Sequence, residues 1–235
     1  MGSTAGAGRL TGANGVTSPQ GQGEGPGPVA SFLGRLINNV VVRSPRLWPL
    51  LRKPVERFFD KAAPGWDNRM QARPGNRLAP LEAAVSAIER TPTRILEVGT
   101  GTGAGAFMLA ERFPEAEILG IDIATQMVRI AAAKAAGEDN RRLRFVAADV
   151  TKLDPDEGTF DLVAMVNMPP FFDNVSRLVG PGGYVAWASS RGSRTPFFTK
   201  ESVLRRGFER CGLRTVAAGA AGGGTYYLAE RPEVE

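Results

Sequence analysis

The residues that could do chemistry begin with four glycines in seven positions: Gly99, Gly101, Gly103 and Gly105 follow the apolar run 95–98. A glycine-rich turn between a strand and a helix lets a ligand approach the free N–H groups of the helix N-terminus. The position of these glycines, at a predicted strand–helix junction, indicates a binding loop for a nucleotide-like cofactor.

Carboxylates stand at the ends of the apolar runs. Glu97 precedes the first glycine by two residues, Asp122 ends the run "LGID", and Asp149 ends "FVAAD". A carboxylate at the end of a parallel strand can accept hydrogen bonds from hydroxyl and amine groups of a ligand. The stretch 101–106 also fits the dinucleotide pattern G-x-G-x-x-G/A, with Asp122 at about the expected spacing of ~20 residues. This pattern alone does not decide between a dinucleotide and another nucleotide-like cofactor.

Other chemistries are excluded by composition. The chain of 235 residues has no histidine and a single cysteine, Cys211. It therefore has no histidine base, no histidine-containing metal site and no disulfide within the chain, and we predict no bound metal. Catalysis would use carboxylates, hydroxyls, amides, lysine, arginine or a reactive cofactor.

Alternating strands and helices position these residues from Arg94 onward. We predict strands at 94–99, 117–122, 142–148, 160–166, 183–190, 213–218 and 224–229, and helices at 104–113, 124–136, 171–179 and 199–211. This alternation is typical of a doubly wound α/β sheet. The last two strands have no helix between them, so we expect an antiparallel edge pair.

The segment before this sheet divides in two. Residues 1–28 are rich in glycine, serine, threonine and proline, and we predict a disordered tail. Residues 29–90 carry apolar side chains at helical spacing and predict a helical cap on the domain 91–235. No uninterrupted apolar run approaches the ~18–20 residues of a membrane span, and we expect a cytoplasmic protein.

Basic residues concentrate at the start of the cap. Between positions 29 and 58, six arginines and lysines stand against Glu56 alone, an excess equal to the net charge of +5 of the whole chain. The rest is close to neutral, so we expect no nucleic-acid partner. Basic amphipathic helices can lie on anionic membranes. We expect the apolar face to pack on the domain instead, with at most weak membrane association. This face comprises Phe32, Leu36, Ile37, Val40, Leu47, Trp48, Leu51, Phe58 and Phe59.

Four motifs in order resemble the class I S-adenosylmethionine-dependent methyltransferases: E-x-G-x-G-x-G at 97–103, Asp122 in "LGIDIATQM", Asp149 in "FVAADV", and the Pro-Gly-Gly turn of "LVGPGGYVAW". The resemblance covers roughly residues 80–229 and implies a Rossmann-like methyltransferase sheet with S-adenosyl-L-methionine as cofactor. The sequence departs from the D-x-S-x-x-M pattern at Ala124, which removes an N-cap side chain that we expect Thr125 to replace.

The resemblance also implies roles for residues. Glu97 orders the loop and helps to hold the ammonium group of the cofactor, and Asp122 binds the ribose hydroxyls. Ile123 and Met127 pack near the adenine, and Asp149 with Val150 meets its exocyclic amine and ring edge. The cofactor-binding set it implies comprises Glu97, Gly99, Thr100, Gly101, Thr102, Gly103, Asp122, Ile123, Met127, Asp149, Val150 and Asn167.

The acceptor site is less defined. "FDKAAPGWDNRM" at 59–70 resembles the F-D-x-x-A-x-x-Y-D segment of the ubiquinone/menaquinone-biosynthesis C-methyltransferases and their small-molecule relatives, in which it closes over the pocket. We expect a small, partly apolar acceptor lined by Trp66, Phe171 and Phe172. Asp67 and Asp173 are candidate bases by location only, and positioning alone can suffice for an acidic enol or phenol.

The sequence leaves alternative functions open. Asn167-Met168-Pro169-Pro170-Phe171 resembles the (D/N)-P-P-(Y/F) motif of amino-group methyltransferases, but Met168 interrupts it. A catalytically silent cofactor-binding partner protein and a nucleotide-dependent oxidoreductase are the other candidate functions. The acceptor, the methylated atom and the oligomeric state are left open.

Overall fold

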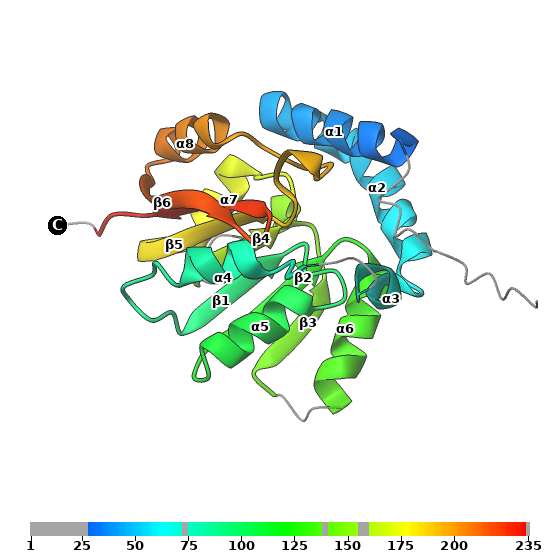
Figure 1. Ribbon diagram of the computed structural model, residues 1–235, viewed down its shortest axis with the longest axis horizontal. Helices are drawn as coiled ribbons and strands as arrows, with labels where there is room; N and C mark the ends of the chain where they lie inside the picture. Colours follow the sequence, from blue (N-terminus) through cyan, green and yellow to red (C-terminus); the bar gives the residue numbers. More distant parts are fainter. Residues whose placement is uncertain (1–27, 72–74, 138–140, 155–159, 234–235) are drawn as a thin grey trace, which may run out of the picture.

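A single mixed sheet of seven strands runs through the molecule (Figure 1). The computed structural model describes residues 28–71, 75–137, 141–154 and 160–233. The strand order is β3-β2-β1-β4-β5-β7-β6, with β1 to β5 parallel and β7 antiparallel to both of its neighbours. The strands are β1 (Arg94–Val98), β2 (Glu117–Asp122), β3 (Leu143–Ala147), β4 (Phe160–Val166), β5 (Val179–Ser189), β6 (Arg214–Ala221) and β7 (Gly224–Glu230). The predicted doubly wound sheet with an antiparallel last pair is confirmed.

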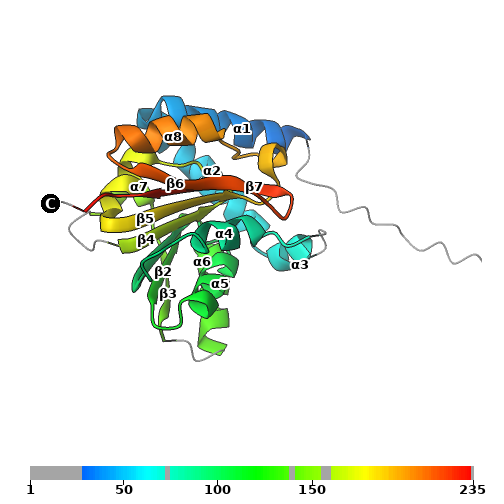
Figure 2. The same cartoon turned by 60° about the vertical axis from the view of Figure 1, so that its left-hand side comes forward.

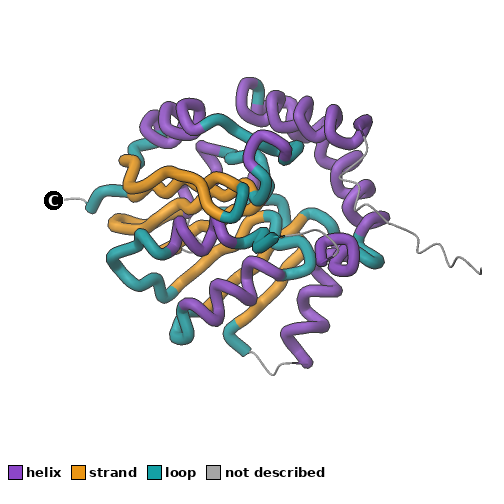
Figure 3. Tube along the Cα trace, in the orientation of Figure 1, coloured by secondary structure: helices purple, strands orange, loops and turns teal. Residues whose placement is uncertain are grey.

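Helices cover both faces of this sheet, as the tube trace also shows (Figure 3). One face carries α4 (Ala79–Val85), α5 (Ala104–Arg112) and α6 (Thr125–Gly137). The other carries α7 (Phe172–Leu178) and α8 (Glu201–Arg210), together with α1 (Pro28–Arg43) and α2 (Trp48–Ala62) (Figure 2). The short η1 (Pro45–Leu47) joins α1 to α2, and α3 (Trp66–Gln71) follows α2. Two further 3-10 turns are η2 (Val150–Lys152) and η4 (Gly192–Arg194).

The side chains of β1 alternate between the two faces of the sheet, so this strand contributes to the apolar clusters on both sides. Ile95 belongs to the apolar cluster under α4 and α5, whereas Leu96 and Val98 belong to the cluster under the opposite layer. Successive side chains of a strand point to opposite faces, so Glu97 points to the same face as Ile95, toward α5. The strand is buried from position 95 to 98, as expected for a central parallel strand.

The fifth strand differs from the prediction. It begins at Val179, not at 183, and the predicted Pro-Gly-Gly turn lies within it. The pairing with β4 shifts there, because Phe160 faces Val179 whereas Leu162 faces Tyr184. Gly182, at a φ of 66°, lies in this irregularity, so the turn residues form a bulge in the strand.

The helices before β1 do not all lie together. Leu81, Ala84 and Val85 of α4 are buried in the same cluster as Ile95 of β1, so α4 is part of the layer beside α5. Helices α1 and α2 pack on the opposite face through Ile37, among others. The predicted tail lies outside the described residues except for Pro28, the first residue of α1.

The expected packing of the apolar cap residues is confirmed for Ile37 and Trp48, which are buried, and is wrong for four others. Phe32, Leu36, Leu47 and Phe58 are exposed, at 69%, 47%, 46% and 49% of their surface. Val55 of α2, which was not part of the expected face, is buried as well. Both faces of these helices are apolar, and hydrophobic spacing alone could not decide which face the sheet covers. Within the described residues, no helix has the length and apolar character needed to cross a membrane.

Candidate functional site

The glycine loop adopts a conformation that needs glycine. Gly99, Gly101 and Gly103 have φ values of 72°, 54° and 91°, in the left-handed region where side chains cost energy. Open space lies beyond Gly101, because a Cβ there would have no heavy atom within 4 Å. The backbone at Gly101 is therefore accessible to a ligand at the carboxyl end of β1.

Glu97 lies beneath this loop, 2% exposed. The Thr100 hydroxyl donates a hydrogen bond to its carboxylate, and the Ala106 N–H in the first turn of α5 donates another. A Cβ on Gly105 would overlap the Glu97 Oε1 atom, so this glycine lets α5 approach the carboxyl group. Burial raises the pKa of Glu97 to about 7. Glu97 thus orders the loop from inside the protein.

Asp122 joins the end of β2 to the same loop. Its Oδ2 accepts a hydrogen bond from the Gly101 N–H at 3.0 Å, and its Oδ1 accepts one from the Ala124 N–H at 2.9 Å. Burial raises the pKa of Asp122, and the hydrogen bonds from Ala124 and Gly101 oppose that shift. A carboxylate can accept about four hydrogen bonds, so Asp122 retains capacity for hydroxyl groups of a ligand.

Asp149, at the end of the β3 segment, is held by the cap. The Trp48 indole Nε1 donates to both carboxylate oxygens at 3.3 and 3.2 Å, and the Arg52 Nε lies 3.7 Å from Oδ2. Asp149 also accepts hydrogen bonds from the backbone and hydroxyl of Thr151. No pattern in the sequence predicted the contacts of Trp48 and Arg52, which lie about a hundred positions from Asp149.

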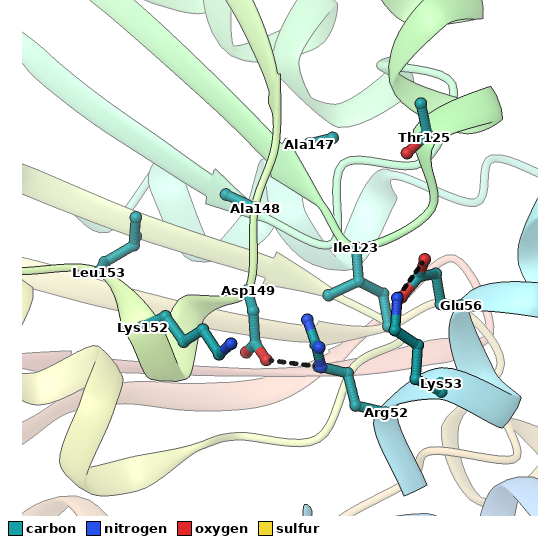
Figure 4. A pocket seen from close by; sticks show the side chains of 10 residues that line it. All are labelled: Arg52, Lys53, Glu56, Ile123, Thr125, Ala147, Ala148, Asp149, Lys152 and Leu153. Carbon is teal, nitrogen blue, oxygen red and sulfur yellow. Dashed lines mark hydrogen bonds and ion pairs between the residues drawn. The ribbon is translucent and has the colours of Figure 1, made fainter. Parts of the chain in front are cut away.

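A cavity of about 370 Å³ opens beside this carboxylate (Figure 4). Ile123 and Asp149, both predicted to contact the adenine, line it together with Arg52 of α2, and Figure 4 shows the Arg52 side chain directed toward Asp149. Met127 does not line it; this side chain is buried against the Ala63 and Ala124 region. Val150 is buried under the opposite layer.

The start of α6 is capped by another helix. Ala124 stands at the N-cap position, and the Asp60 Oδ1 of α2 accepts the hydrogen bond of the Gln126 N–H at 2.8 Å. The sequence predicted that Thr125 would replace the missing cap, and that was wrong: Thr125 is the first helical residue, and α2 supplies the acceptor. Asp60 belongs to the F-D-x-x-A segment at 59–70. The resemblance of that segment to one that closes over the pocket was the only indication in the sequence of where Asp60 lies.

Asp67, which is half-buried, contacts the glycine loop. Its Oδ1 accepts a hydrogen bond from the Thr102 hydroxyl at 2.6 Å, and its Oδ2 lies 2.7 Å from the Lys134 Nζ of α6. Lys134 also donates to the Thr102 carbonyl oxygen at 2.9 Å. Burial acts to raise the pKa of Asp67, but the hydrogen bonds from Lys134 and Thr102 hold it below its usual range.

The loop after β4 is strained and anchored. Asn167 and Phe171 have φ values of 55° and 40°, unusual for residues other than glycine. The Asn167 side-chain oxygen accepts hydrogen bonds from the Ser190 N–H and hydroxyl. Met168, the residue that interrupts the proline motif, lies against Gly99, where a Cβ would overlap its sulfur. Its carbonyl oxygen accepts the Trp187 indole N–H at 2.8 Å.

Aromatic side chains of α2 pack against rings from three other segments. Phe59 of α2 packs edge-on against Trp66, with ring centres 5.9 Å apart, and lies 6.4 Å from Phe197. Phe171 packs edge-on against Trp48 at 5.1 Å. Of the predicted aromatic lining, Trp66 and Phe171 lie beside the cap; Phe59 and Phe197 were not predicted.

Two predicted acceptor-site residues point elsewhere. Phe172 packs edge-on against Phe208 of α8 at 5.0 Å and fills the space beside Gly207. Asp173 is exposed, and the Cys211 thiol lies 3.5 Å from its Oδ1. The structure therefore does not bring Phe172 and Asp173 together with Asp67 and Trp66.

A glycine loop after β1, an acidic residue at the end of β2 and an antiparallel β7 define a doubly wound cofactor-binding protein. A family model described as a methyltransferase domain matches residues 95–183. A malonyl-[acyl-carrier protein] O-methyltransferase of Geobacter sulfurreducens is 32% identical over 70% of this chain and 72% of its own length. A demethylmenaquinone methyltransferase of Thermus thermophilus is 36% identical over 54% of this chain and 61% of its own.

The crystal structure of a SAM-dependent methyltransferase from Aquifex aeolicus shares the fold, with a TM-score of 0.56 and 19% identity over 66% of this chain and 91% of that one. The chain belongs to the class I S-adenosylmethionine-dependent methyltransferases, and its cofactor is S-adenosyl-L-methionine. The chain spans less than two thirds of the length of several of the relatives it matches.

Proposed function

We propose that this chain transfers a methyl group from S-adenosylmethionine to a small, partly apolar acceptor, at carbon or at oxygen. The observation that carries the proposal is the junction of β1 and β2, where the Gly101 N–H donates to Asp122 beside open space. A ligand there meets loop backbone and a carboxylate with unused acceptor capacity at once. That combination suits the ribose and methionine parts of this cofactor.

We assign the cofactor contacts along the carboxyl edge of the sheet. The loop from Gly99 to Gly103, with Thr100 and Thr102, would contact the methionine part, with Glu97 ordering it from below and near the ammonium group. Asp122 would bind the ribose hydroxyls. Ile123 and Asp149 would contact the adenine, which the cavity between them supports. The other three residues of the predicted set would support the site without contacting the cofactor, because Met127 and Val150 are buried and Asn167 is hydrogen-bonded to Ser190.

The acceptor would lie under the cap, beside the loop after β4. Its apolar part would meet Trp66 and Phe197, whose rings both approach Phe59. Phe171, whose ring packs on Trp48 instead, would add to this lining. Phe172 would support Phe171 from the core side, since its own ring packs on α8. A lining of aromatic rings favours a flat, partly apolar acceptor.

Bound S-adenosylmethionine supplies an electrophilic methyl group on its sulfonium. The residues of the chain would exclude water and orient the acceptor, and we propose no side-chain base. Asp67 is paired with Lys134 and has a lowered pKa, which makes it a weak proton acceptor. Asp173 is exposed beside Cys211. An acceptor that is acidic by itself, such as an enol or a phenol, fits this arrangement.

Calorimetry and a transfer assay test the proposal. The full chain should bind S-adenosylmethionine and S-adenosylhomocysteine, and not NADPH. With a radiolabelled methyl donor, it should label a member of an acceptor panel, which would include a demethylated naphthoquinol and a malonyl thioester because relatives are named for such acceptors. The Asp122→Ala variant is the control and should lose labelling.

Two outcomes would contradict the proposal. Binding of NADPH in preference to S-adenosylmethionine would favour an oxidoreductase. Cofactor binding without labelling of any acceptor in a panel extended to a cell extract would favour a catalytically silent partner protein.

We also infer a cytoplasmic location, in keeping with a single cysteine, and no nucleic-acid partner, since charges outside 29–58 nearly balance.

A further inference from the structure

The outer surface of α1, η1 and α2 is both apolar and basic. Of the eight large hydrophobic side chains exposed among the described residues, six lie on these elements. The most exposed are Phe32 at 69% and Leu50 at 73%. We define the cap face as these six and the basic residues beside them: Phe32, Leu33, Leu36, Leu47, Leu50 and Phe58, with Arg43, Arg46, Lys53, Arg57 and Lys61.

Helical spacing places the two kinds of residue on one side of α2. Exposed positions recur along it at intervals of three and four, as expected for a single stripe: Leu50, Lys53, Pro54, Arg57, Phe58 and Lys61. The inward stripe carries Trp48, Arg52 and Val55, which contact the domain. The same helix therefore holds Asp149 with one side and presents apolar and cationic groups with the other.

The charges of the cap face are largely unpaired. Lys53 pairs with Glu56 at 3.1 Å, but Arg43, Arg46, Arg57 and Lys61 take part in no ion pair within the described part of the chain. Unpaired cations beside exposed leucine and phenylalanine complement an anionic lipid surface, where the rings enter the headgroup boundary and the cations meet phosphates. Two copies of this face would repel each other by charge. Nucleic acid would leave the apolar side chains without a partner.

We propose that the cap face docks the protein on anionic lipid membranes. Docking uses only the outer sides of α1 and α2, so the contacts of α2 with Asp149 and with the start of α6 stay intact. The proposal does not depend on methyl transfer. Of the cap face, only Lys53 also lines the cavity beside Asp149, and the variants of the test leave Lys53 unchanged.

The test is sedimentation of the full chain with vesicles of phosphatidylcholine alone or mixed with phosphatidylglycerol. We expect binding to the mixed vesicles only, weakened by salt. Reversal of two charges in Arg43→Glu/Arg46→Glu should weaken binding by at least about tenfold, since each basic residue contributes about 1 kcal/mol near such a surface. Phe32→Ser/Leu50→Ser should weaken it similarly.

Matched controls lie away from the cap, on α5, β3 and β6. Arg112→Glu/Arg144→Glu changes the net charge equally, and Val146→Ser/Val216→Ser removes two other exposed apolar side chains. Both should bind as the unmodified chain does, and circular dichroism should show all four variants folded. Equal losses in controls and cap variants, or no binding by the unmodified chain, would overturn the proposal. Concentration-dependent dimerisation abolished by Phe32→Ser/Leu50→Ser, without vesicle binding, would assign the face to a second copy instead.

Discussion

Removal of the Asp60 carboxylate should remove the N-terminal cap of α6, although Asp60 lies 66 residues earlier in the sequence than the N–H group it accepts from. In the structure, Oδ1 of Asp60 accepts the Gln126 N–H at 2.8 Å, while the N-cap residue Ala124 has no acceptor of its own. Loss of an N-cap acceptor costs about 1 kcal/mol, within a range of about 0.5–2. We therefore expect Asp60→Ala to lower the free energy of unfolding by about 1 kcal/mol, or roughly 2–4 °C in Tm.

A local cap should compensate for the distant one. Ala124→Ser places a hydroxyl at the N-cap position, where it can accept the same N–H group. We expect it to restore most of the stability of Asp60→Ala and to add little to the unmodified chain. Asp60→Asn keeps an acceptor oxygen without the charge and should retain most of the stability.

Urea unfolding of the four members of this cycle measures the coupling between the two positions. The reasoning requires a coupling energy of about 0.5 kcal/mol or more between Asp60→Ala and Ala124→Ser. Additive effects, or a loss in Asp60→Ala that Ala124→Ser does not reduce, would refute the claim that both side chains cap α6. The loss in Asp60→Ala would then reflect a packing change in α2.

Three further predictions concern the loop and the two carboxylates that hold it. Asp122→Ala should weaken S-adenosylhomocysteine binding by about 1.5–3 kcal/mol, the range for hydrogen bonds to a charged group; unchanged affinity in calorimetry would remove Asp122 from the site. Gly101→Val should abolish that binding in a folded protein, since a β-branched residue resists the φ of 54°, and normal binding would contradict the loop assignment. The pKa of Glu97 is raised from 4.5 to about 7 by burial, so its contribution to stability is full below the unfolded value and lost as pH rises through the folded one. Urea unfolding at about pH 5 and about pH 8 should show a fall of up to about 3 kcal/mol that Glu97→Gln flattens; an identical pH dependence in that variant would exclude Glu97 as the cause.

The sequence by itself determined the sheet and the residues at its carboxyl edge. Strand and helix periodicity is local, and so is the positive φ that makes glycine necessary at Gly99, Gly101 and Gly103. The acidic ends of β2 and the β3 segment, Asp122 and Asp149, follow from their place in apolar runs. The order of these signals along the chain also carried the resemblance to the methyltransferases, which the comparisons confirm.

Only the tertiary structure decided what the cap does. Trp48 meets Asp149, and Asp60 meets the start of α6, through contacts that span 101 and 66 residues. Such pairings depend on how α2 crosses α6 and the end of the sheet, and nothing in the spacing of side chains along α2 fixes that crossing.

The same limit explains the wrong prediction for the cap face. The helices α1 and α2 carry apolar side chains on more than one side, so periodicity predicted helices but not the covered side. Packing in the core on the α7–α8 side of the sheet buried Ile37 and Val55 and left Phe32 and Leu50 exposed. Burial is a property of the assembled layers, because it depends on the volume available between α1, α2 and the sheet rather than on the local sequence.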